Sequence, residues 1–204
     1  MKQTEVGALL LGGGVSRRFG SDKRQHALGD SFVADQTLRI YVATFPRVCV
    51  VLREADPELA RRLHDLHPQV QIVHAAQSSL GMGHSLAAGA QTVTWHWTFV
   101  GLLDMPFVQS QTLNLLQAAT AQVELEAGAA KTIVRPSSVV EGGTRTGHPI
   151  GFHHSLLPAL QALTGDEGAR SVVRAHAAQV LDVPVIDQGI FRDIDTPKDV
   201  PPRD

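Results

Sequence analysis

Short apolar runs alternate with longer segments of helical period along the 204-residue chain, and this alternation limits the fold more than any other feature. A run of five or six apolar residues suits a buried strand, and the segments between such runs are long enough for crossover helices. The pattern predicts an α/β fold: a three-layer sandwich with a Rossmann-like, mostly parallel sheet. We expect a single domain over residues 1–204, an ordinary size for one domain.

The expected strands and helices follow one another as such a sheet requires. Strands are expected at Val6–Leu11, Val48–Leu52, Val70–His74, Thr98–Leu103, Ala130–Val134, Pro149–Phe152, Val180–Val183 and Ile190–Asp193. Helices are expected at Phe32–Thr44, Asp56–Leu66, Gly83–Val93, Ser110–Glu126, Ser155–Leu163 and Glu167–His176. Ligands of such sheets bind on the loops at the carboxyl ends of the strands. Gly12, Gly81 and Asp104 follow three of these strands, so a ligand site is expected there.

Composition argues against several classes of function. The chain carries 18 Lys and Arg against 20 Asp and Glu, and this net charge of −2 gives no long-range attraction to nucleic acid or to an anionic membrane. The apolar run Val6–Leu11 is far shorter than the ~20 residues that span a bilayer. A lone Cys49 excludes an intramolecular disulfide. We expect a cytoplasmic protein without nucleic-acid or membrane partners.

A glycine-rich loop directly follows the first expected strand and reads Leu11-Gly12-Gly13-Gly14-Val15-Ser16-Arg17-Arg18. Three consecutive glycines allow a tight turn, and the exposed N–H groups of such a turn form a concavity that binds anions. Arg17, Arg18 and Lys23 add positive charge, which favours a triphosphate as the anion. The loop is not a Walker loop, because Gly-Lys-Ser/Thr is absent. It is not a dinucleotide fingerprint either, because Arg17 stands where that motif needs glycine.

This segment resembles the signature of the molybdenum-cofactor nucleotidyltransferases, in which a Leu-small-small-Gly strand end precedes an Arg-Met/Phe-Gly step and a lysine. The resemblance implies that Arg18 and Lys23 hold the triphosphate and are catalytic. It implies nucleotide contacts from Leu11, Gly12, Gly13, Gly14, Ser16, Arg17 and Lys23. Lys23 follows Gly20 by three residues, as in the cytidylyltransferase branch, whereas Gly13 stands where that branch has alanine. The expected nucleotide is therefore CTP or GTP, with a preference for CTP.

Two carboxylates are candidates for a metal site. Asp104 ends an apolar strand, and a carboxylate at a buried strand end must be paired or must bind a cation. Mg²⁺ takes one or two carboxylates together with phosphate oxygens, so Asp104 suits both metal binding and catalysis. The resemblance adds a closing motif, Asp193-Ile194-Asp195-Thr196-Pro197, in which Asp195 is a metal carboxylate. The alternative is that Asp195 only braces the terminal turn, where Thr196 and Pro197 are expected to begin a short helix.

Three further motifs resemble the cytidylyltransferase branch: Gly81-Met82-Gly83-His84-Ser85-Leu86, Gly147-His148-Pro149 and Gly165-Asp166-Glu167-Gly168-Ala169-Arg170. The first begins an expected helix whose N–H groups can face an anion, and Gly83 and Ser85 are expected to contact the nucleotide. The other two imply an acceptor side formed by His148, Asp166 and Arg170. The resemblance covers nearly the whole chain, from Leu9 to Asp199.

Together these motifs predict a magnesium-dependent nucleotidyltransferase with a sheet of the nucleotide-diphospho-sugar transferase type. It is expected to move CMP or GMP to a molybdopterin-type cofactor, to release pyrophosphate, and to hand its product to a molybdoenzyme or its chaperone. One alternative is a sugar phosphate or another small phosphate as the acceptor. Another is a non-catalytic, NTP-binding cofactor chaperone, which two departures from the family pattern keep open: Leu103 in place of glycine and the polar segment Arg24-Gln25-His26.

Overall fold

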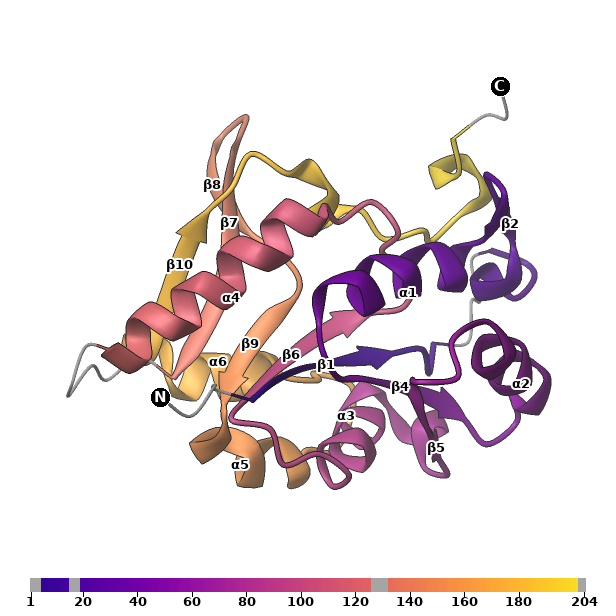
Figure 1. Cartoon of the computed structure of the whole chain (residues 1–204), viewed down its shortest axis with the longest axis horizontal. Helices are drawn as coiled ribbons and strands as arrows, with labels where there is room; N and C mark the ends of the chain where they lie inside the picture. Colours follow the sequence, from indigo (N-terminus) through magenta and orange to yellow (C-terminus); the bar gives the residue numbers. More distant parts are fainter. Residues whose placement is uncertain (1–4, 15–18, 126–131, 202–204) are drawn as a thin grey trace.

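A mixed sheet with helices on both faces forms the centre of the computed structural model, which describes residues 5–14, 19–125 and 132–201 (Figure 1). The strands run in the order β10-β7-β9-β6-β1-β4-β5, and β8 extends the sheet by pairing with β7. Their bounds are β1 (Val6–Leu11), β4 (Val48–Arg53), β5 (Gln71–Ala75), β6 (Trp97–Leu102), β7 (Ile133–Val140), β8 (Gly143–Thr146), β9 (Ile150–His153) and β10 (Val180–Pro184). Because only β8 and β9 run antiparallel to their neighbours in this sheet, it is mostly parallel, as predicted.

Alternation along the strands builds two separate apolar layers. In β1, Ala8 and Leu10 face one layer and Leu9 and Leu11 face the other, since successive side chains of a strand point to opposite faces. Helices α1 (Val33–Thr44), α2 (Pro57–Leu66) and α4 (Ser110–Leu125) contribute buried residues to the first layer. Helices α3 (Met82–Ala90), α5 (Leu157–Gln161) and α6 (Arg170–Ala175) contribute to the second. The result is the predicted three-layer sandwich.

The chain departs from expectation near its end and at one hairpin. The expected strand Ile190–Asp193 is absent, and a 3-10 helix covers Gln188–Phe191 instead. Its cause is local: the Asp187 carboxylate accepts the Gly189 N–H at 2.8 Å, and a side chain that binds nearby backbone competes with strand pairing. Strand β8 was not expected, and β7 extends six residues beyond the expected end at Val134.

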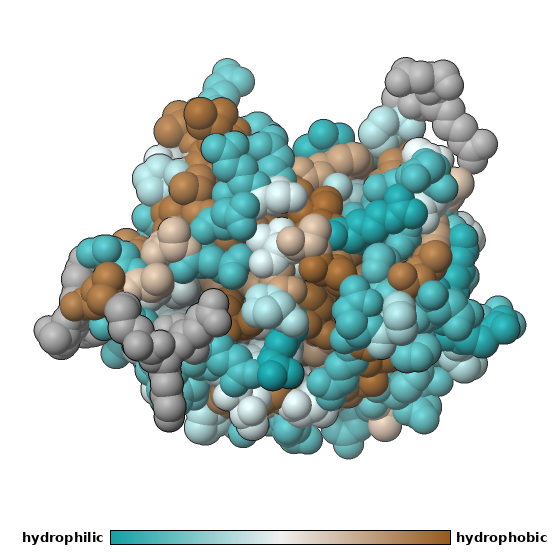
Figure 2. All heavy atoms as spheres, in the orientation of Figure 1, coloured by the Kyte–Doolittle hydropathy of each residue, from teal (hydrophilic) through white to brown (hydrophobic). Residues whose placement is uncertain are grey.

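The surface over α1 and α4 is mostly hydrophilic, with hydrophobic residues gathered between the two helices (Figure 2). In the same view the β7–β8 hairpin projects from the body of the molecule. Among the described residues, the helices are too short or too polar to cross a bilayer.

Candidate functional site

The glycine-rich loop begins where β1 ends, and its first residues are held by the sheet. The Gly12 N–H donates to the Val51 carbonyl at 2.8 Å, and the Leu103 N–H donates to the Leu11 carbonyl at 3.0 Å. A Cβ atom at Gly12 would lie 2.8 Å from a methyl carbon of Leu103, so only glycine fits without a shift. A Cβ atom at Gly13 would lie 2.8 Å from Ser85 Oγ of α3. The loop and the start of α3 therefore form one surface.

The remaining loop residues fall into two groups. Apart from its chain neighbours, no described residue lies within 4 Å of the place where a Cβ atom of Gly14 would stand, as expected of backbone that a ligand can approach. Three predicted nucleotide contacts, Ser16, Arg17 and Arg18, lie outside the described residues, so their roles stay predictions.

Lys23 joins the two predicted metal carboxylates. Its ammonium lies 2.7 Å from Asp104 Oδ2 and 2.7 Å from Asp195 Oδ1. The Lys23 side chain is only 8% exposed, so these charges interact largely out of water. Residues separated by up to 172 positions in sequence thus meet at the carboxyl end of β1 and β6, where the strand pattern placed the ligand site.

The buried charges of this group shift one another's pKa. Burial raises the pKa of Asp104, and the Lys23 ammonium opposes this rise without reversing it. Burial alone would lower the pKa of Lys23, but Asp104 and Asp195 outweigh it and raise that pKa. Asp104 Oδ1 is buried and has no hydrogen-bond partner among the described residues. A buried carboxylate oxygen without a donor is costly, and it is a natural ligand atom for a hard divalent cation such as Mg²⁺.

Asp195 owes its position to its neighbours in sequence. Ile194 is fully buried against Phe19 and Val33, and its N–H donates to the Asp104 carbonyl at 2.9 Å. Alternation therefore holds here, with Ile194 turned inward between two more exposed residues, although the segment is not a strand. A 3-10 helix (Pro197–Asp199) follows, and Thr196 caps it as predicted, through a capping box with Asp199.

Arg24, which the sequence presented only as a departure from the family pattern, organises the base of the loop. Its side chain is 2% exposed, and its guanidinium donates to Asp22 at 2.8 Å and to Asp56 at 2.6 and 2.9 Å. A further bond reaches the Gly12 carbonyl, so Arg24 fixes the glycine-rich loop directly. Burial alone would raise the pKa of Asp56, but hydrogen bonds from Arg24 and Arg53 outweigh it and lower that pKa.

The Gly81–Gly83 turn packs tightly on the segment that carries Asp166. Gly81 has φ +128°, and a Cβ atom there would lie 2.3 Å from the Gly165 carbonyl oxygen and 2.5 Å from Asp166 Oδ1. The Gly83 N–H donates to the Gly165 carbonyl at 2.8 Å. Two of the motifs identified in the sequence are therefore in direct contact, and Asp166 lies at their junction.

His148 lies in the segment between β8 and β9. Its Nδ1 atom is buried without a hydrogen-bond partner among the described residues. Burial lowers the pKa of His148, and the charge of Arg170 lowers it further, against a hydrogen bond to the Val100 backbone and the charge of Asp193. Since Asp193 also acts on Asp104, His148 and Asp104 share one electrostatic environment. Arg170 itself is exposed at the start of α6.

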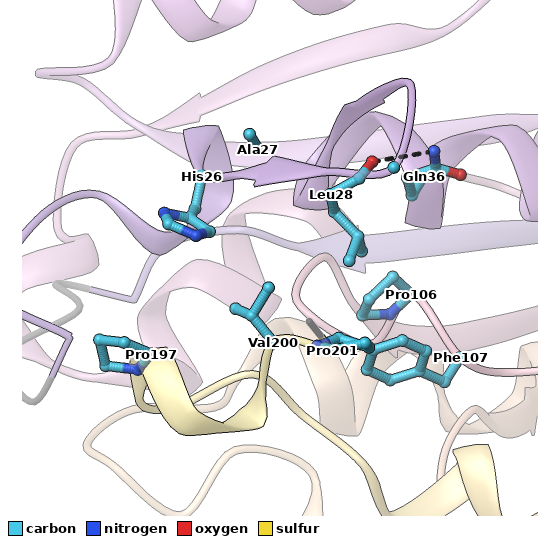
Figure 3. A pocket seen from close by; sticks show the side chains of 10 residues that line it. His26, Ala27, Leu28, Gln36, Pro106, Phe107, Pro197, Val200 and Pro201 are labelled. Atoms are coloured by element: carbon cyan, nitrogen blue, oxygen red, sulfur yellow. Dashed lines mark hydrogen bonds between the residues drawn. The ribbon is translucent and has the colours of Figure 1, made fainter. Parts of the chain in front are cut away.

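A pocket of about 840 Å³ borders this group. Each wall of the pocket follows one of Lys23, Asp104 and Asp195 in sequence. The walls are the β2–β3 hairpin (Ala27–Leu28 and Ser31–Phe32), Pro106 with Phe107, and the segment from Pro197 to Pro201. In Figure 3 the side chains of Leu28 and Val200 extend toward each other across it. Gln36 braces the hairpin by donating to the Leu28 carbonyl at 3.2 Å (Figure 3). These walls, which expose polar and apolar surface in nearly equal amounts, were not predicted, because no single sequence segment contains them.

Comparison with known proteins assigns a family to this arrangement. The family model of the MobA-like NTP transferase domain matches residues 8–180, from β1 to the start of β10. The chain belongs to the MobA-like NTP transferase family. No curated protein matches it in sequence.

Solved structures similar to this MobA-like chain share its fold. The Rv0371c homologue from Mycobacterium sp. strain JC1 is 24% identical, with a TM-score of 0.77 over 97% of this chain and 93% of that one. The Rv0371C complex with manganese from Mycobacterium tuberculosis H37Rv is 22% identical, with a TM-score of 0.69 over 96% of each chain. The 4-diphosphocytidyl-2C-methyl-D-erythritol synthase from Anaerococcus prevotii DSM 20548 is 11% identical, with a TM-score of 0.72 over 95% and 92%.

The predicted family and fold class are thus confirmed, and the MobA-like NTP transferase is a nucleotidyltransferase. Its geometry brings together Lys23, Asp104 and Asp195, with the Gly12–Gly14 backbone at the same strand end. It also joins the Gly81–Gly83 turn to Asp166.

Proposed function

We propose that this nucleotidyltransferase moves CMP, or alternatively GMP, from CTP or GTP to a phosphorylated acceptor of the molybdopterin type, with Mg²⁺ as its metal. The observation that carries the proposal is the convergence of Lys23, Asp104 and Asp195 beside the glycine-rich loop. Positive charge, two carboxylates and open backbone are what binding a metal–triphosphate complex requires. The recipient would be a molybdoenzyme or its chaperone, in the cytoplasm.

The reaction is a displacement at phosphorus. An oxygen of the acceptor phosphate forms a bond to the α-phosphorus of the NTP, and the bond from that phosphorus to the β-phosphate oxygen breaks, so pyrophosphate leaves with the electron pair. The acceptor oxygen is already anionic at neutral pH, so no side chain has to remove a proton. Because anions must approach one another, the protein contributes mainly positioning and charge neutralisation.

Each member of the site has a role in this scheme. The backbone from Gly12 to Gly14 would hold the triphosphate, and Lys23 would neutralise it, with Ser16, Arg17 and Arg18 adding contacts. Asp104 and Asp195 would hold Mg²⁺, which supplies charge stabilisation at the phosphate oxygens when bound. Asp104 Oδ1 has no hydrogen-bond partner in the part of the chain that the structure describes, and this supports the role for Asp104.

Different residues would bind the nucleotide and the acceptor. Ser85 lies beside the glycine-rich loop, and Gly83 packs against Gly165; both are proposed to contact the nucleotide. His148, Asp166 and Arg170 are proposed to bind the acceptor. The buried Nδ1 atom of His148, which has no hydrogen-bond partner among the described residues, supports this role, because an N–H or O–H group of a ligand could satisfy it.

A second acceptor class is compatible with the same fold. The fold is shared with a 4-diphosphocytidyl-2C-methyl-D-erythritol synthase, and a fold of this kind can serve several acceptors. A sugar phosphate or another small phosphate is therefore the alternative substrate, and a non-catalytic NTP-binding chaperone is the alternative without chemistry. The paired carboxylates favour catalysis, since simple nucleotide binding does not need two acids at one buried lysine.

Pyrophosphate release tests the proposal. The protein is incubated with CTP, GTP, ATP or UTP, with and without molybdopterin cofactor, in Mg²⁺ and in chelator. We expect release only with Mg²⁺ and the cofactor, and fastest with CTP. Release with a sugar phosphate but not with the cofactor would replace the proposed acceptor. Mg²⁺-dependent NTP binding without release under any condition would favour the chaperone.

A further inference from the structure

Three histidines lie close together at the end of the sheet opposite the glycine-rich loop, where β6 begins and β9 ends. His96 directly precedes β6 and His153 ends β9, and because these strands are antiparallel neighbours, Trp97 pairs with His153 in the register. The His154 N–H donates to the His96 carbonyl at 2.8 Å, which brings the third imidazole to the same place. The six residues of β6, about 20 Å at 3.3 Å per residue, separate this group from Asp104. The two sites are therefore distinct.

The imidazoles are oriented toward one another. Each offers one ring nitrogen, and these three nitrogens lie within 4.8 Å of one another. The His153 and His154 rings have centroids 4.1 Å apart, and the His96 ring lies 4.8 Å from the first and 4.5 Å from the second. Two nitrogens bound to one zinc ion at about 2.05 Å are about 3.3 Å apart at the tetrahedral angle, so the widest pair must close by about 1.5 Å. Modest side-chain rotation covers this distance.

Glu124, in the last turn of α4, places a carboxylate oxygen beside two of these imidazoles. Its Oε1 atom lies 3.0 Å from His96 Nε2 and 3.7 Å from His153 Nε2, which bracket the spacing expected around zinc. Trp97 Nε1 donates to the same oxygen at 2.9 Å and so fixes the carboxylate. Outer contacts of this kind are typical of metal sites, where they orient the ligands.

The remaining contacts leave the right atoms available. His153 Nδ1 lies 2.9 Å from Ser155 Oγ, so that nitrogen has its own partner while Nε2 faces Glu124. His154 is exposed, and the side chains of His96 and Glu124 are about one-third exposed, so an ion can enter from solvent.

We propose that His96, His153 and His154, together with Glu124, form a binding site for a borderline divalent transition metal, of which Zn²⁺ is the model ion. Three imidazole nitrogens and one carboxylate are a donor set for Zn²⁺, Co²⁺ or Ni²⁺, and a poor one for Mg²⁺ or Ca²⁺, which prefer oxygen ligands. A bound ion would tie the end of α4 to β6 and β9 at the sheet edge away from catalysis.

Direct metal titration tests this site without reference to enzyme activity. Untagged, metal-stripped protein is titrated with Zn²⁺ by calorimetry in excess Mg²⁺, and with Co²⁺ by visible absorption. We expect one tight Zn²⁺ equivalent and the intense cobalt band of a tetrahedral site. His153→Gln and His154→Gln should each weaken Zn²⁺ binding by roughly 10²-fold or more, because loss of even an outer-shell partner costs about 10–100-fold. Glu124→Gln should weaken it in the same direction.

Matched variants distinguish this site from binding at scattered surface histidines and from the site beside the glycine-rich loop. His64→Gln changes an exposed histidine on α2 and should leave the Zn²⁺ affinity unchanged. Asp104→Asn should also leave it unchanged, because Asp104 lies at the opposite end of β6. His154→Gln changes an exposed side chain, so its metal-free thermal midpoint should match the wild type, while Zn²⁺ should raise the midpoint of the wild type alone. Equal Zn²⁺ affinity in the wild type and His154→Gln would overturn the proposal, as would binding that only Asp104→Asn abolishes.

Discussion

Replacing Arg24 with methionine removes a buried guanidinium while keeping an unbranched side chain of moderate length. In the native structure this group donates to two carboxylates and to the Gly12 carbonyl, and its side chain is 2% exposed. Breaking a buried pair by removing one partner costs about 3–5 kcal/mol, because the remaining charge loses its compensation. Arg24→Met should therefore destabilise the protein strongly.

The contacts that remain place the loss at the lower end of that range. Asp56 is 5% exposed but keeps Arg53, which donates to it at 2.9 and 2.6 Å. Asp22 is 26% exposed and regains water. We therefore expect a loss of about 3 kcal/mol, which corresponds to a fall of about 6–12 °C in the melting temperature for a chain of this size. Arg24→Lys should lose less, since it keeps the charge but cannot make the same paired bonds.

Chemical and thermal unfolding measure this effect. The matched control is Arg174→Met, because Arg174 pairs with Glu167 where both side chains are at least 60% exposed, and such pairs contribute at most about 1 kcal/mol. Urea midpoints and melting temperatures are compared for both variants and the wild type. If Arg24→Met lost no more stability than Arg174→Met, the reasoning that this buried network holds the loop base would be wrong.

The pH dependence of the same difference gives an independent check. Hydrogen bonds from Arg24 and Arg53 lower the pKa of Asp56 against the effect of burial. A carboxylate with a lowered folded-state pKa stabilises the protein above its unfolded pKa of about 3.9, and this contribution is lost as the pH falls through the folded-state value. The difference in unfolding free energy between wild type and Arg24→Met should therefore shrink as the pH is lowered from about 6 to values below the unfolded pKa. Urea midpoints measured across this pH series follow that difference. A gap that widened toward low pH would contradict the assignment.

Three further predictions concern activity, stability and metal binding. Lys23→Ala and Asp104→Asn should each lower kcat by roughly 10²-fold or more in the pyrophosphate assay, the scale of losing one preorganised charge-stabilising group, while the exposed Lys198→Ala stays near wild type. Gly81→Ala should lower thermal stability and raise KM for the nucleotide, because φ is +128° and the added Cβ atom would lie 2.3 Å from a carbonyl oxygen. An unchanged KM and melting temperature would show that the turn accommodates the side chain. Asp199→Ala removes the capping box and should weaken Mn²⁺ binding at the neighbouring Asp195 carboxylate. Calorimetry measures this affinity, and an unaltered value would show that the capping box does not position Asp195.

Much of the fold could be predicted because its signals are local. Val6–Leu11 was predicted with both ends correct, and Val48–Leu52 differs from β4 by one residue, since short apolar runs with clear boundaries mark buried strands. Strand β8 has four exposed residues and no apolar alternation, so periodicity could not reveal it. The two-residue link Glu141–Gly142 before it is a hairpin signal that could have done so.

The residues of the site could likewise be predicted from their local motifs, whereas the contacts between distant motifs could not. Lys23, Asp104 and Asp195 were each identified from their own motifs, but no motif states that one ammonium lies between two carboxylates. Arg24 looked like a departure from the family pattern because its partner Asp56 lies 32 residues away. A pairing of this kind depends on the packing of the loop against the start of α2. Hydrophobic periodicity in the sequence gives no indication of this pairing.

The charge balance of the site explains why three distant segments have to meet there. Two carboxylates and one ammonium leave a net charge of −1 among Lys23, Asp104 and Asp195, and a divalent cation would change it to +1, which complements a triphosphate. This balance depends on Asp195, and Asp195 reaches the site only because Ile194 is buried and bonded to the Asp104 backbone. In the proposed function, docking of the C-terminal segment completes the electrostatics of the nucleotide site, so we expect affinity for a metal–NTP complex to depend on the packing of Ile194 as well as on the glycine-rich loop.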